Sequence, residues 1–131
     1  MGLDQFMYRA DNDDIAERIL MGEDTGAPSW YGRKINFLQN RISEIIGNEV
    51  DNVTFYEISL DDIQQIIEDC HFVKEHPESA EDMLPTVEGF FFGSTEYGDL
   101  YFEDIDYLLE SLPVFIKGSD ENTRYIYYSW Y

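Results

Sequence analysis

Cys70, His71 and His76 carry the softest metal-binding side chains of the chain, and the three fall within seven residues. A structural zinc site usually needs four ligands, and no fourth ligand follows at a recognised spacing. As a nucleophile, Cys70 would need an exposed thiolate with a low pKa. It instead recurs with Ile63 and Ile66 at helical spacing, which predicts a buried and inert thiol. We expect neither a zinc site nor a catalytic cysteine.

Asp11, Asp13 and Asp14 resemble the start of a calcium-binding loop. Ala16 stands where such a loop needs its glycine, and Gly22 stands where it needs its bidentate glutamate. Helix capping explains the cluster better, because acidic side chains stabilise the N-terminus of a helix.

Gly89, Gly93 and Gly98 are spaced too widely to cradle a phosphate, and their neighbours are acidic. A glycine-rich phosphate loop normally opens a helix and has basic residues nearby. The sequence therefore predicts no catalytic residue, no metal ligand and no cofactor, and hence a protein that is not an enzyme.

The acidity of the chain is its most informative property. It has 28 Asp and Glu against 8 Lys and Arg, a net charge of −20 on 131 residues. Duplex DNA carries this charge on roughly 34 Å of its axis, and a compact chain of this length is about 36 Å across. The protein thus has about the charge of a DNA segment of its own size, which predicts a basic partner surface and no direct binding to nucleic acid.

The composition also predicts a folded chain. Hydrophobic residues make up 44% and aromatic residues 16% of it, whereas acidic disordered segments are poor in aromatics. We expect one globular domain over residues 1–131. No apolar run is long enough to cross a bilayer, and no signal or lipidation motif opens the chain. We therefore expect a soluble intracellular protein without a membrane partner, and we predict no oligomeric state.

Four helices are expected from apolar periodicity and capping residues. Ser59 caps the best defined of them, and Ile63, Ile66 and Cys70 form its buried stripe. Pro113 is expected to end the last helix. The predicted ranges are 12–20, 33–46, 60–70 and 102–112.

Clusters of β-branched and aromatic residues predict strands over 3–9, 52–57, 87–92 and 124–130. Polar segments rich in Gly and Pro predict loops over 22–29 and 76–82. Because helices and strands alternate irregularly, we expect an α+β domain with a small, mainly antiparallel sheet. Three or four helices should pack against one face of that sheet.

Carboxylates recur at helical spacing opposite the apolar stripes of two predicted helices, which places them together on the surface. The same pattern is expected of an acidic surface retained only for solubility. The candidate partner-binding residues are Asp61, Asp62, Glu68, Asp69, Glu96, Asp99, Glu103, Asp106 and Glu110.

The segment LPTVEGFFFGSTEY at 84–97, followed by YFEDI at 101–105, resembles a family of small proteins common in bacteriophage and prophage genomes. The opening MGLD, the segment YGRKIN at 31–36 and the aromatic ending share the resemblance. Members typically carry Trp where this chain has Gly32, and a His shortly after the position of Asn36. The resemblance implies a phage origin and a place in the cytoplasm of the infected bacterium.

The leading hypothesis is an inhibitor of a host defence protein, of the anti-CRISPR or anti-restriction type, that occupies a nucleic-acid groove with its carboxylates. An alternative is a phage adaptor or small-ligand binding protein that uses the aromatic C-terminus, 125–131, as its contact surface. In a ligand pocket, Ser94, Thr95, Glu96 and Tyr97 would form the polar rim, with Arg33 and Lys34 as basic partners. An enzyme would need Glu96, Tyr97 or Arg33 to meet in a cleft.

Overall fold

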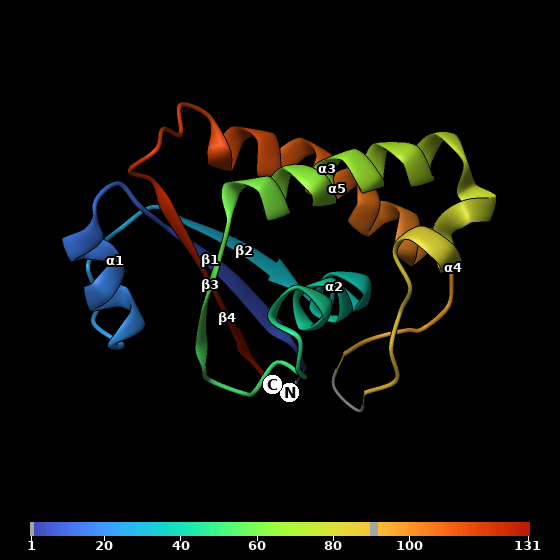
Figure 1. The fold of residues 1–131 in the computed structure, drawn as a ribbon. Coiled ribbons are helices and arrows are strands. Elements are labelled where there is room, and N and C mark those ends of the chain that lie inside the picture. Colours follow the sequence, from blue (N-terminus) through green and yellow to red (C-terminus); the bar gives the residue numbers. More distant parts are fainter. Residues whose placement is uncertain (1, 90–91) are drawn as a thin grey trace.

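The computed structural model describes residues 2–89 and 92–131 (Figure 1). In this part of the chain four antiparallel strands form one sheet in the order β2-β1-β4-β3. The long strands β1 and β4 lie at its centre, and the expected α+β class is confirmed. The strands are β1 (Asp4–Ala10), β2 (Ser29–Arg33), β3 (Phe55–Ile58) and β4 (Arg124–Trp130).

Helices cover both faces of the sheet, so the expectation of helices on one face only is wrong. The main core joins Met7, Tyr125 and Tyr127 of the sheet to α2, α3 and α5. On the opposite face α1 packs on Ala10 and Ile126, away from the other helices (Figure 1). The helical segments are α1 (Asp13–Leu20), α2 (Asn36–Ile46), α3 (Leu60–Glu75), η1 (Pro77–Ser79), α4 (Ala80–Met83) and α5 (Asp99–Ile116).

The predicted caps agree with the structure. Ser59 and Asp62 form a reciprocal capping box at the start of α3, with hydrogen bonds of 3.0 and 3.1 Å. Asn12 caps α1 by accepting from the Ile15 amide. These two helix starts could be predicted because each cap is a local sequence signal.

Several predicted segments differ from the structure. The predicted loop over 76–82 contains η1 and most of α4, and the helix predicted from 33 begins at Asn36. The segment 29–33 is strand β2, although no strand was predicted there and Arg33 was expected to begin a helix. Its residues alternate between buried and exposed, with Trp30 in the core. Residues 87–89 and Phe92 are not in a strand, while positions 90 and 91 of that prediction lie outside the described residues. Asn36 holds this segment instead, exchanging two hydrogen bonds of 2.7 and 2.8 Å with the Val87 backbone.

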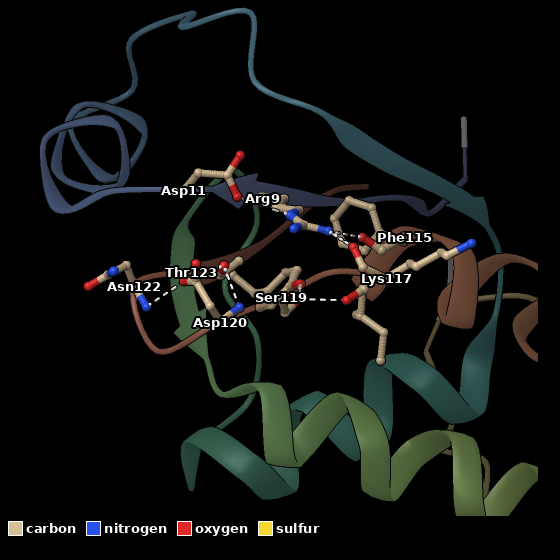
Figure 2. A network of polar contacts seen from close by, with 10 residues as sticks. Arg9, Asp11, Phe115, Lys117, Ser119, Asp120, Asn122 and Thr123 are labelled. Carbon is tan, nitrogen blue, oxygen red and sulfur yellow. Dashed lines mark hydrogen bonds and ion pairs between the residues drawn. The ribbon is translucent and has the colours of Figure 1, made fainter.

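Helix α5 continues past Pro113 to Ile116, so the prediction that this proline ends the helix is wrong. Arg9 of β1 holds the end of the helix. Its guanidinium donates to the carbonyl oxygens of Phe115 at 3.0 Å and Lys117 at 2.7 Å, and to Asp11 at 3.2 Å (Figure 2). Carbonyls at a helix C-terminus have no partner within the helix, and a cation from a distant strand supplies one here.

We expect Arg9→Ala to lower the free energy of unfolding by about 2 kcal/mol, because hydrogen bonds to a charged donor are lost and two carbonyls lose their partner. Urea denaturation measures the change. The control is Arg18→Ala, which removes an exposed pair with Glu23 and should cost less than about 1 kcal/mol. Equal losses in the two variants would contradict a structural role for Arg9.

A buried side-chain amide fixes the start of α2. The Gln5 amide accepts from the Ile35 N–H at 2.9 Å and donates to the Ile35 carbonyl at 3.0 Å and to the Tyr127 hydroxyl at 3.0 Å. Tyr127 in turn donates to Gln39 of α2 at 2.5 Å. Since no side chain caps α2 at Ile35, this network sets the position of the helix relative to the sheet.

Candidate functional site

Six of the nine candidate carboxylates form one exposed set on α3 and α5, which lie side by side over the sheet (Figure 1). We call this set the acidic helical layer. Each member points away from the buried stripe of its helix, as the spacing predicts. The members are Asp61, Glu68, Asp99, Glu103, Asp106 and Glu110.

The other three candidates have different surroundings. Asp62 is half-buried, and its carboxylate accepts from the Ser59 amide. Glu96 is exposed but lies before α5. Asp69 is only 7% exposed and binds Arg41 at 2.6 Å and Gln65 at 3.0 Å. The interior ion pair between α2 and α3 removes Asp69 from the partner-binding surface.

Cations are distributed unevenly over the described residues. Arg124 contacts Asp13, Glu17 and Glu57 at 2.6 to 3.3 Å, and hydrogen bonding to Arg124 lowers the pKa of the Glu57 carboxyl. Arg9 and Arg18 pair with further acidic residues of the same end of the molecule. Three arginines therefore offset about half of the negative charge of the six carboxylates that they contact around α1.

The acidic helical layer has much less compensation. Lys74 is the one Lys or Arg within the ranges of α3 and α5, and it pairs with Asp106 at 2.7 Å. Lys117 follows the last residue of α5. The negative charge is thus concentrated over these two helices.

The charge spacing along α5 can be compared with that of nucleic acid. From Asp99 to Glu110 the helix rises about 16 Å and presents four exposed carboxylates. One DNA strand carries about five phosphates over the same length. Helix α5 therefore approaches the charge density of a single strand and not that of a duplex.

A cavity of about 240 Å³ lies between the start of α5 and the connection from β2 to α2. Ser94 and Glu96 line it together with Arg33 and Lys34, as expected for a pocket, whereas Thr95 and Tyr97 are not among its lining residues. Tyr97 instead accepts from the Thr86 amide at 3.0 Å. The remaining lining residues are Asn36, Phe37, Thr86, Gly93, Leu100, Tyr101, Glu103 and Asp104.

Asp104 is the most perturbed carboxyl of this cavity. Burial raises its pKa to about 7, and the charge of Glu103 adds to the shift. Carboxyls with such raised pKa values are often found at functional sites. The sequence pattern alone gave no reason to choose Asp104, because its position between two other acidic residues resembles an ordinary exposed helix face.

We expect Asp104→Asn to change how stability depends on pH. Folded Asp104 keeps its proton up to about pH 7, whereas the unfolded chain releases it near about pH 4, so this group makes stability fall as pH rises through that window. The variant should show a shallower fall and exceed the parent above about pH 7. Urea denaturation across this range measures the difference. The matched control is Glu110→Gln, and parallel curves for the parent and Asp104→Asn would contradict the prediction.

The outer face of the sheet carries a cluster of aromatic rings. Phe6 lies 5.2 Å from Tyr31 and 6.0 Å from Tyr128, and Phe55 lies 4.6 Å from Tyr128, measured between ring centroids. Tyr31 is 45% and Trp130 59% exposed. We call these five residues the aromatic sheet face.

The expectation that the aromatic residues of 125–131 together form one contact surface is wrong. Tyr125 and Tyr127 are fully buried in the core. Only alternate residues of β4, Tyr128 and Trp130, contribute rings to the outer face.

The described residues contain neither an exposed cysteine nor a group of metal ligands. Cys70 is buried, and burial raises the pKa of its thiol to about 12, as expected for an inert cysteine. Within residues 2–89 and 92–131 no three His, Cys, Asp or Glu side chains are grouped to hold a metal ion. In the same part of the chain no helix has the length and apolar character needed to span a bilayer.

Comparison with protein-family models, with curated proteins and with solved structures gives no match.

Proposed function

We propose that this protein inhibits a nucleic-acid-binding protein of host defence by placing the acidic helical layer in the groove that normally holds nucleic acid. The observation that supports the proposal most is the uneven charge: α3 and α5 together contain one lysine and no arginine, while three arginines offset part of the negative charge at the α1 end. Such a surface attracts a basic groove at long range and increases the association rate. The resemblance to phage proteins favours a defence protein as the target.

The charge spacing along α5 also indicates which kind of groove the protein would occupy. Because α5 carries about the linear charge of one strand, it suits a groove that binds single-stranded nucleic acid or one strand of a duplex. The rings of the sheet face lie on the other side of the molecule and leave this contact dominated by charge. We therefore expect binding that weakens steeply with salt.

The test is affinity capture from bacterial lysate with the immobilised protein at about 50 and about 200 mM salt, followed by elution with single-stranded or duplex DNA. A protein held by six or more phosphate-like contacts should lose about 10³-fold or more in affinity over this range. Mass spectrometry should identify a nucleic-acid-binding protein that DNA displaces. A retained protein that DNA does not displace would contradict mimicry.

Two charge variants decide whether the layer itself makes the contact. The layer variant changes Asp61 and Asp99 to Asn and Glu68 and Glu110 to Gln, and it should lose the captured protein. The control variant has the same net charge, so equal loss in both would show that total charge alone determines binding. It changes Glu49, Glu81, Glu88 and Glu121, all exposed, to Gln.

The aromatic sheet face supports a second candidate function, an adaptor that binds another protein through exposed rings. Tyr and Trp bring large contact areas at low entropic cost and are favoured at interfaces. Tyr31 and Trp130 are the exposed members of the cluster. A contact of this kind is apolar and should resist salt.

We expect the double variant Tyr31→Ser and Trp130→Ser to release any partner that stays bound at about 0.5 M salt, where charge interactions are screened within about 4 Å. Capture at this salt concentration with parent and variant measures the effect. Val114→Ser, which removes an exposed apolar side chain of α5, is the control. Retention of the same partner by the double variant would exclude the adaptor surface.

A further inference from the structure

The cavity at the start of α5 has charges of opposite sign on its walls. Lys34, Glu96, Glu103 and Asp104 are all among the residues that line it. Of the described ion pairs, none involves the side chains of these four residues. Arg33 adds a second cation, which also contacts Asp4 at 3.3 Å.

The backbone holds Lys34 in place. Its φ of 53° is in the left-handed region, and its amide donates to the Leu3 carbonyl at 2.8 Å. Gly93 packs directly on it, because a Cβ at Gly93 would lie 3.0 Å from the Lys34 carbonyl oxygen and 3.2 Å from the Lys34 Cβ. Gly93 itself has a φ of 86°, which glycine adopts without strain. A non-glycine residue in the left-handed region often marks a functional position.

The floor of the cavity is aromatic and rigid. The rings of Phe37 and Tyr101 lie 4.9 Å apart, and both residues are buried. The Tyr101 hydroxyl is already bound to the Leu84 carbonyl at 2.9 Å, and Asn36 is bound to Val87. Phe37 and Tyr101 therefore offer apolar contact, and the charged groups of Lys34, Glu96, Glu103 and Asp104 offer polar contact to a ligand.

These charges select the ligand. An anion such as phosphate would be repelled by the carboxylates of Glu96 and Glu103, and a simple cation would be repelled by Lys34 and Arg33. A neutral ligand would remove both sets of charges from water without compensation, which is costly. A molecule with an ammonium group and a carboxylate group satisfies both sets at once.

We propose that this cavity binds a small zwitterion, an α-amino acid or a dipeptide, with its ammonium group at Glu96, Glu103 and Asp104 and its carboxylate at Lys34 and Arg33. The volume of about 240 Å³ lies below the 300 Å³ or so at which pockets for drug-sized ligands begin. A single residue or a short dipeptide is of suitable size. This site shares Glu103 with the acidic helical layer, but it recognises a small ligand and not a macromolecular groove.

The test is a nuclear magnetic resonance titration of the ¹⁵N-labelled protein with the common L-amino acids and glycylglycine, each to about 10 mM, which detects millimolar binding. We expect at least one to shift the amides of 93–104 and of Lys34. For each binder, the amine that lacks the carboxylate and the acid that lacks the amine should bind at least tenfold more weakly. No shift with any probe, or equal binding of the amine alone, would overturn the proposal.

Variants assign the two ends of the ligand. Lys34→Met should weaken the zwitterion at least tenfold and leave the amine analogue unaffected. Asp104→Asn should weaken both above about pH 7, where Asp104 is ionised. The control Lys117→Met removes a lysine that does not line the cavity. Equal weakening by Lys34→Met and Lys117→Met would overturn the assignment. The comparison of analogues uses the parent protein alone, so it decides the question even where a variant fails to fold.

Discussion

The pairing of the Gln5 amide with both backbone groups of Ile35 is the constraint on which the rest of the structure depends. It joins the central strand β1 to the residue before α2 in a fully buried setting, where an unsatisfied polar group is costly. With Ile35 fixed, Asn36 is placed to hold Val87. Lys34 and Phe37, which flank Ile35 and Asn36 in the sequence, both line the cavity. One buried amide thus connects the sheet, a helix and the cavity at the start of α5.

Local signals in the sequence predicted much of the fold. The capping box at Ser59, the cap at Asn12 and the aromatic strand over 124–130 each depend on neighbouring residues, and each is present. Predictions failed where a distant residue intervenes. Pro113 does not end α5, whose last carbonyls Arg9 holds from 100 positions or more away. No local pattern can report such a partner.

The predictions for the candidate partner-binding surface likewise succeeded where local spacing determines burial and failed where a distant residue intervenes. Helical spacing correctly placed Glu68, Glu103 and Glu110 on exposed faces, because the apolar stripe determines which side of a helix is buried. It also placed Asp69 outside, where the structure has an interior pair with Arg41. The cavity residues were partly foreseen, since Arg33, Lys34, Ser94 and Glu96 do line one space. The role of Asp104 depends on burial, which sequence spacing does not reveal.

The end around α1, whose charge three arginines partly offset, and the more acidic end over α3 and α5 make the molecule a permanent electric dipole. In the field of a basic body such a molecule experiences a torque as well as an attraction. It turns while still in solution, so that α3 and α5 lead and the sheet edge near α1 trails. The positions of the eight Lys and Arg residues therefore help to determine the orientation in which the molecule approaches a basic partner, before side-chain contacts form.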